Sequence, residues 1–196
     1  SLCLKKSFEE EANMSDEMLI RHCSPTLAGL KTANMFLYKY ESLEEMRKAI
    51  RRINKKLGAK GLRMVPLKYG EGKALIYLYR PDFLKNDLSH EKAEKILLQK
   101  GYRGEGCGSC LSKLSKRMKE DRDFPHEIGL FLGYPPEDVQ GFIEGKKECA
   151  QCKGCWKVYS DPEGAIRKFN KFNKCKMIYK NMYDEGADIE TLALMR

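Results

Sequence analysis

The sequence predicts an α+β fold, in which a small mixed sheet of three to four strands is covered by about six helices. Helical spacing is clearest over residues 43–57, where apolar side chains recur every three or four positions behind a capping sequence that begins at Ser42. Two strand-like segments, 62–68 and 73–79, flank Gly70-Glu71-Gly72 and predict a β-hairpin.

The elements expected before the 43–57 helix are short. Ser15 suits an N-cap, so we expect a helix from there to about His22. Ser24-Pro25 predicts the start of a second helix, because proline is favoured at the first helical position. Residues 34–38 are aromatic and typical of a strand. This assignment places Cys23 at the mouth of the second helix.

The rest of the chain is predicted to be mostly helical. Helices are expected at 89–100, 109–121, 124–133, 136–143 and from 162 onward, with a strand at 156–159 and one more helical turn after Gly186. The inward side of the long helix is assigned to Ile166, Phe169, Phe172, Met177 and Ile178. We expect residues 1–13 to be an N-terminal extension and 14–196 to be a single domain, with a soft subdivision near 101–108.

Composition narrows the class of protein. The chain has 196 residues, a formal net charge of +9 and 42% hydrophobic residues, so a collagen-like or wholly disordered chain is excluded. No apolar run approaches the roughly 18–20 residues that span a bilayer, and the first residues lack the apolar core of a signal peptide. We therefore expect a cytoplasmic protein with no membrane partner, whose eight cysteines are metal, redox or nucleophile candidates rather than disulfides.

The cysteines that follow residue 106 predict a metal site. Cys149-Ala-Gln-Cys152-Lys-Gly-Cys155 contains two overlapping C-x-x-C steps, which bring three thiolates within reach of one ion. We expect Cys175 as a candidate for a distant fourth ligand. Cys107-Gly-Ser-Cys110 is a second C-x-x-C that could instead join the first cluster in a four-thiolate zinc site. These ligands suit zinc or an iron–sulfur cluster alike. The alternative is a set of unligated thiols in a reducing cytosol.

Cys23 is the candidate nucleophile. A thiol just before a helix N-terminus has a lowered pKa, which suits a nucleophile, a metal ligand or a haem ligand. His126 would supply a base, with Glu127 beside it, if folding brings them near Cys23. The alternatives are a buried thiol packed as a small hydrophobic side chain and a histidine engaged in local hydrogen bonds at a helix start.

Three sequence strings resemble one family of proteins of unknown function from clostridia and other anaerobic bacteria. They are Arg21–Lys31, the Phe-Pro-His-Glu-Ile-Gly string that runs from Phe124 to Val139 with Gly141-Phe142, and Gly154–Tyr159. The resemblance runs from Met14 almost to the end of the chain. It implies a cytoplasmic protein of anaerobes, loosely associated with iron or redox metabolism, and it supplies no activity.

Basic residues form a further pattern on the 43–57 helix. Arg47, Arg51, Arg52 and Lys55, together with neighbouring lysines, lie opposite its apolar seam and could follow a phosphate backbone. A solvated helix face is the alternative interpretation. The glycine-rich sequences of nucleotide-binding loops do not occur, so nucleotide hydrolysis and dinucleotide chemistry are disfavoured.

Three functional hypotheses remain from the sequence. The leading one is a cytoplasmic thiol and metal-site protein that acts on a small molecule or cofactor. The second is a cysteine-nucleophile transferase or hydrolase centred on Cys23. The third is a zinc-stabilised adaptor that binds nucleic acid or protein through the basic helix.

Overall fold

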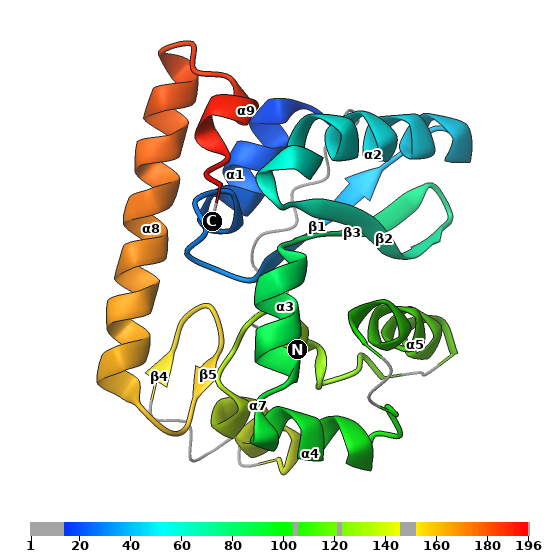
Figure 1. Cartoon of the computed structure of the whole chain (residues 1–196), viewed down its shortest axis with the longest axis vertical. Coiled ribbons are helices and arrows are strands. Elements are labelled where there is room, and N and C mark those ends of the chain that lie inside the picture. Colours follow the sequence, from blue (N-terminus) through cyan, green and yellow to red (C-terminus); the bar gives the residue numbers. More distant parts are fainter. Residues whose placement is uncertain (1–13, 104–105, 121–122, 146–151, 196) are drawn as a thin grey trace. The chain divides into compact units, whose positions relative to one another are not determined.

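Residues 14–103, 106–120, 123–145 and 152–195 are described by the computed structural model (Figure 1). The described chain divides into two units. We call residues 14–82 with 172–195 the sheet unit, and residues 83–171 the helical unit. The predicted extension over 1–13 lies outside the described residues, and the single domain with a soft subdivision near 101–108 stays a prediction.

The sheet unit contains the three-stranded sheet that makes the fold α+β. Its strands are β1 (Ala33–Lys39), β2 (Arg63–Gly70) and β3 (Lys73–Tyr79), in the spatial order β1-β3-β2. Both strand pairs are antiparallel, so the sheet is not mixed as the sequence predicted. The reason is that α2 (Leu43–Leu57) carries the chain from β1 to β2, and the hairpin strand β3 is inserted between those two strands.

The hairpin and α2 follow from local sequence chemistry. The turn residues Glu71 and Gly72 have φ values of 52° and 72°, which fits a two-residue turn of the type that matches strand twist. The Ser42 side chain accepts a hydrogen bond from the Glu45 backbone N–H at 3.1 Å, which confirms the predicted cap of α2. The buried face of α2 consists of Met46, Ile50, Ile53 and Leu57.

The first helix differs from the prediction. α1 (Asp16–Leu27) begins after Ser15, as expected, but it continues through Pro25 without a break. Packing holds the helix together at this point, because Cys23, Pro25 and Leu27 are all buried. The Ser24 hydroxyl donates to the Ile20 carbonyl within the helix. The predicted second helix start at Ser24 is therefore wrong. Buried side chains of α1, α2 and the sheet form one apolar core.

The helical unit is built from short helices and one small hairpin. Its elements are α3 (Pro81–Leu88, beginning at the unit boundary), α4 (Glu91–Gln99), α5 (Cys107–Glu120), α6 (Ile128–Phe131), α7 (Pro136–Ile143), β4 (Cys152–Lys153) and β5 (Lys157–Val158). The sequence analysis missed α3, since it assigned no element between the strand at 73–79 and the helix at 89–100. Pro81 occupies the first position of this helix, where proline is favoured.

The last helices complete the two units. α8 (Pro162–Asp184) contributes its first residues to the helical unit and its last residues to the sheet unit, and α9 (Ile189–Leu192) follows. The buried side of α8 is Ala165, Phe169, Phe172, Cys175 and Tyr179. Ile166, Met177 and Ile178 were predicted to face inward but are 47%, 69% and 44% exposed.

Candidate functional site

Cys23 lies inside α1 in the core of the sheet unit, where its side chain is fully buried. Burial raises the pKa of the Cys23 thiol, although Lys31 and Lys176 oppose the shift. The expectation of a lowered pKa at a helix mouth is wrong, because no helix begins at Ser24. Cys175 belongs to the same core, and burial raises its pKa to about 11.

His126 and Glu127 belong to the helical unit and have different surroundings. His126 is exposed, and its ring lies edge-on to Phe142 with the ring centroids 4.7 Å apart. Glu127 is 1% exposed. These neighbours therefore differ, since His126 has an exposed ring and Glu127 has a buried carboxyl group. Cys23 is a residue of the other unit, so the three predicted catalytic residues do not gather within either unit.

The predicted metal ligands are only partly described. Cys149 lies outside the described residues, and the position of the Cys152 side chain is not described. Cys155 is half-buried in the turn between β4 and β5, and Cys175 belongs to the sheet unit. Within the described residues, no three Cys, His, Asp or Glu side chains form a group that could hold a metal ion. The zinc, iron–sulfur and haem assignments stay predictions.

The two remaining cysteines occupy the first turn of α5. Gly106 precedes the helix with φ 87°, and its carbonyl accepts the Cys110 backbone N–H at 3.1 Å. Cys107 is the first helical residue and is half-buried, whereas Cys110 lies one turn deeper and is buried. Neither residue is in a disulfide bond. Burial raises the pKa of Cys107, and the nearby Lys85 ammonium partly offsets that effect.

A buried polar cluster lies beside this dithiol. The Tyr102 hydroxyl donates to Glu127 Oε1 at 3.1 Å, and Arg117 Nε lies 2.8 Å from the same oxygen. Burial raises the pKa of Tyr102, followed in size by the effect of the Glu127 carboxylate, and Cys110 lies near enough to add to the shift. Arg117 belongs to α5, so this cluster fixes the dithiol helix against the turn that precedes α6.

Asp138 is the centre of a second buried polar cluster in the helical unit. This α7 residue is 2% exposed. Its carboxylate accepts from Trp156 Nε1 at 2.7 Å, from the backbone N–H groups of Tyr159 and Ser160 at 2.8 and 2.9 Å, and from the Ser160 hydroxyl. The Trp156 ring also stacks on Tyr134 with ring centroids 4.8 Å apart. Sequence reasoning missed Asp138, since the sequence signal was only that of an acid in a first helical turn.

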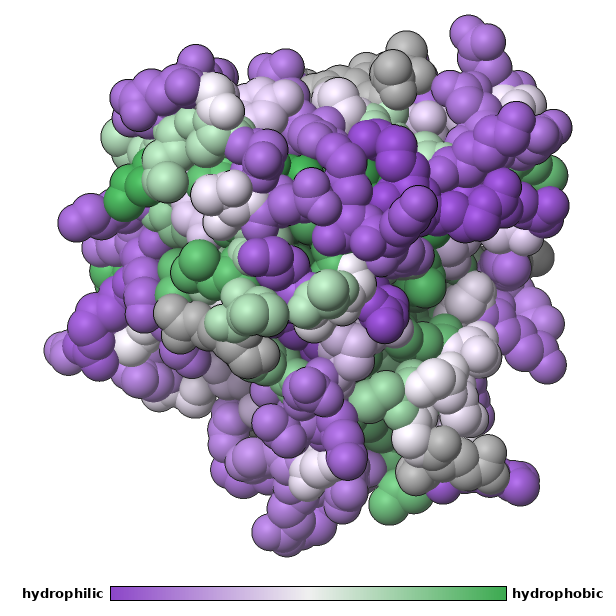
Figure 2. Space-filling model, turned by 45° about the horizontal axis from the view of Figure 1, so that its top comes forward, coloured by the Kyte–Doolittle hydropathy of each residue, from purple (hydrophilic) through white to green (hydrophobic). Residues whose placement is uncertain are grey.

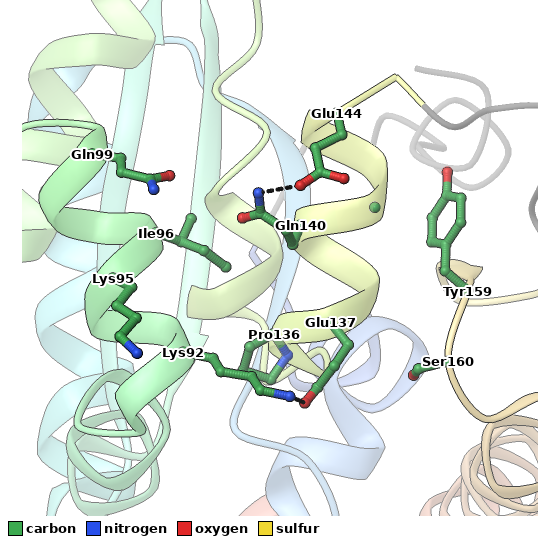
Figure 3. Close-up of a pocket in the computed structure, with 11 residues that line it drawn as sticks. Lys92, Lys95, Ile96, Gln99, Pro136, Glu137, Gln140, Glu144, Tyr159 and Ser160 are labelled. Carbon is green, nitrogen blue, oxygen red and sulfur yellow. Dashed lines mark hydrogen bonds and ion pairs between the residues drawn. The ribbon is translucent and has the colours of Figure 1, made fainter.

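A groove of about 670 Å³ lies in the helical unit and is bordered by α4 and α7 (Figure 3). Lys92 of α4 donates to Glu137 of α7 at 2.6 Å, and Gln140 donates to Glu144 at 2.6 Å. The hydrogen bond from Lys92 lowers the pKa of Glu137. The lining balances Lys92 and Lys95 against Glu137 and Glu144, so the groove presents no excess charge that would select an ionic ligand.

One of the four predicted nucleic-acid-binding residues is engaged in contacts within the sheet unit, and the other three are exposed. Arg52 lies 3.3 Å from Asp16 Oδ1 and donates to the Met14 carbonyl at 2.6 Å, so it helps to fix α2 against the start of α1. Arg47, Arg51 and Lys55 are exposed on the outer face of α2.

The fold and these sites define an α+β protein. Its helical unit has two cysteines, Cys107 and Cys110, in the first turn of α5, and its sheet unit has the basic helix α2. The chain belongs to the family described as a protein of unknown function (DUF3793), whose model matches residues 19–193. No curated protein and no solved structure matches the chain. Among the described residues, no helix has both the length and the apolar character required to cross a membrane.

Proposed function

We propose that this protein is a thiol–disulfide exchange protein whose reactive pair is Cys107 and Cys110. The observation that supports this function is their placement on one helical turn, with one thiol half-buried and the next buried beneath it. Side chains three positions apart on a helix have Cβ atoms about 5–6 Å apart, so a small adjustment joins them as a disulfide.

The two thiols have unequal roles in the proposed reaction. Cys107 is the nucleophile because it is the more accessible, and the helix N-terminus and Lys85 both favour its thiolate. Cys110 is the resolving thiol, held by the buried face that includes Leu111 and Leu114.

The exchange balances in atoms and electrons. The Cys107 thiolate attacks one sulfur of a substrate disulfide, and the other sulfur leaves as a thiolate that takes up a proton. Cys110 then loses its proton and attacks the Cys107 sulfur, which releases the second substrate thiol. The substrate disulfide gains two electrons, and the protein dithiol becomes a disulfide. A cellular dithiol would restore it.

The raised pKa of Cys107 predicts the direction in which the pair works. A thiol with a high pKa is a poor leaving group, so the Cys107–Cys110 disulfide should resist attack and the reduced pair should act as a reductant. The same shift lowers the thiolate fraction at any pH below that pKa. The exchange rate should therefore rise with pH over a higher range than for an ordinary thiol, whose pKa is about 8.5.

The test is to treat the reduced full-length protein with oxidised glutathione and to map disulfides by mass spectrometry. The wild-type protein is expected to form a Cys107–Cys110 disulfide and to retain no glutathione on either residue. Cys110→Ser removes the resolving thiol, so glutathione should remain on Cys107. Cys107→Ser should leave Cys110 unmodified, because that thiol is buried.

Cys155→Ser is the matched control, since Cys155 is a half-buried thiol of the same unit outside the pair. This variant should form the Cys107–Cys110 disulfide like the wild type. Glutathione that persists on Cys107 in the wild type would contradict the proposal. So would one equivalent of zinc that blocks both thiols, a result that would favour the four-thiolate site predicted from the sequence.

A further inference from the structure

The outer face of α2 contains two kinds of basic residue. Three of them are already engaged, because Lys48 lies 2.8 Å from Glu44, and Arg52 and Lys56 lie 3.3 and 2.9 Å from Asp16. The remaining three are Arg47, Arg51 and Lys55, which we call the α2 ridge. All three are exposed, and across the part of the chain that the structure describes none of them forms an ion pair.

The side chains of the α2 ridge are evenly spaced along a helix that is hydrogen-bonded to the sheet. Its members are four residues apart, which sets successive side chains about 6 Å apart along the helix axis. This spacing is close to that of successive phosphates on a nucleic-acid strand. Asn54 fixes the helix to the sheet, since its side chain donates to the Met64 carbonyl at 2.9 Å and accepts the Met64 N–H at 2.7 Å. Like charges at this spacing destabilise a helix, and within the described residues none of the three ridge side chains forms an ion pair that would offset this repulsion.

We propose that the α2 ridge binds the phosphate backbone of double-helical nucleic acid without reading its sequence. Figure 2 shows hydrophilic surface gathered over the side of the sheet unit on which α2 lies in Figure 1. A membrane surface is disfavoured, because the apolar face of α2, which includes Met46 and Ile53, is buried in its own core instead of being free to insert. Single strands are disfavoured because α2 contains no aromatic residue on which bases could stack.

The test is fluorescence anisotropy of the full-length protein with a labelled mixed-sequence DNA duplex, the same sequence as an RNA duplex, and vesicles that contain phosphatidylserine. Three phosphate contacts predict a log–log salt slope of about −2.7, which weakens duplex binding about 40-fold between about 50 and 200 mM salt. Arg47→Ala/Arg51→Ala/Lys55→Ala should weaken it at least about tenfold at the lower salt. Arg47→Lys/Arg51→Lys keeps the charge and should bind within about threefold of the wild type.

The matched control removes three positive charges elsewhere. Lys168→Ala/Lys171→Ala/Lys174→Ala changes exposed lysines of α8 and should weaken binding less than about threefold. An equal loss in this control would show that net charge, not the α2 ridge, is responsible, and would overturn the proposal. Binding to the vesicles but to neither duplex would also overturn it. The inference is independent of the dithiol, because Cys107→Ser/Cys110→Ser should bind a duplex like the wild type.

Discussion

The sheet unit and the helical unit each bury a charged side chain and satisfy it in opposite ways. In the sheet unit, Arg80 is 1% exposed and donates to the backbone carbonyls of Thr26, Leu27, Lys60 and Leu194. In the helical unit, Asp138 accepts hydrogen bonds from Trp156, Tyr159 and Ser160. The cation meets the carbonyl end of α1, and the anion lies in the first turn of α7, so each charge complements a helix dipole.

The two units also differ in the exposure of their thiols, although Cys110 of the helical unit is buried. Cys23 and Cys175 of the sheet unit are packing groups in an apolar core. Cys107 and Cys155 of the helical unit are half-buried and can meet a reagent. The proposed thiol chemistry therefore belongs to the helical unit, whereas Cys23 and Cys175 pack as small hydrophobic side chains in the core of the sheet unit.

The largest effect is expected for Arg80→Ala. The substitution leaves the Leu194 carbonyl without its side-chain donor, takes one hydrogen bond from each of the Thr26 and Leu27 carbonyls, and removes the buried stem of the Arg80 side chain. The Thr26 and Leu27 carbonyls keep the backbone N–H groups of Gly29 and Leu194 as donors. The free energy of unfolding should fall by roughly 3–5 kcal/mol, measured by urea denaturation. Arg63→Ala is the control, since Arg63 is exposed in the same unit, and it should cost less than about 0.5 kcal/mol. Equal losses of stability in Arg80→Ala and Arg63→Ala would contradict the claim that the buried hydrogen bonds of Arg80 stabilise the sheet unit.

Asp138→Ala should rank second, with a loss of roughly 3 kcal/mol, because the Trp156 indole N–H and two backbone N–H groups lose their acceptor. Trp156 is the single tryptophan of the chain, so its fluorescence reports on the helical unit. Asp138→Asn should recover part of this loss, since it keeps one acceptor oxygen. Unchanged fluorescence and stability in Asp138→Ala would contradict the assigned hydrogen bonds.

The cysteines should show a smaller contrast. Cys23→Ser places a hydroxyl in a dry core and should lower the free energy of unfolding by about 1–2 kcal/mol. Cys107→Ser changes a half-buried position and should cost less than about 0.5 kcal/mol. Urea denaturation of both variants checks this. If the order were reversed, the division between packing thiols and reactive thiols would not hold.

The smallest effect is expected at the groove. Glu137 has a lowered pKa, so the ion pair with Lys92 adds stability above the unfolded carboxyl pKa of about 4.3 and loses it as the pH falls through the folded value. Both side chains are more than one third exposed, at 59% and 39%, so solvent screening limits Glu137→Gln to about 0.5 kcal/mol or less at neutral pH. The difference in stability between Glu137→Gln and the wild type should vanish at about pH 2. Thermal unfolding at several pH values measures this difference. A difference that grows with acid would contradict the sign.

The sequence predicted best the elements that local chemistry determines. Ser42 and Glu45 fix the start of α2, and the turn at Glu71 and Gly72 fixes the hairpin, because each signal lies within a few residues of its effect. The same local rules failed at Pro25, where the surrounding core keeps α1 continuous and thereby removes the predicted helix mouth at Cys23.

The candidate sites were harder to predict because their contacts join distant residues. Tyr102 meets Glu127 across 25 positions, and Arg80 meets Leu194 across 114. A sequence pattern gives no sign of which buried partner a charge will find. The C-x-x-C pair at Cys107 and Cys110 was visible, but its unequal burial on a helix turn was not.

Site-resolved alkylation of the native, reduced protein is the most direct test of the central claim that the reactive thiols belong to the helical unit. Iodoacetamide labelling followed by peptide mass spectrometry should modify Cys107 about a thousandfold faster than Cys23, because Cys23 is exposed only when the core opens. The account predicts that Cys23 and Cys175 stay unlabelled until denaturant is added. Labelling of Cys23 at the rate of Cys107 or faster would contradict it.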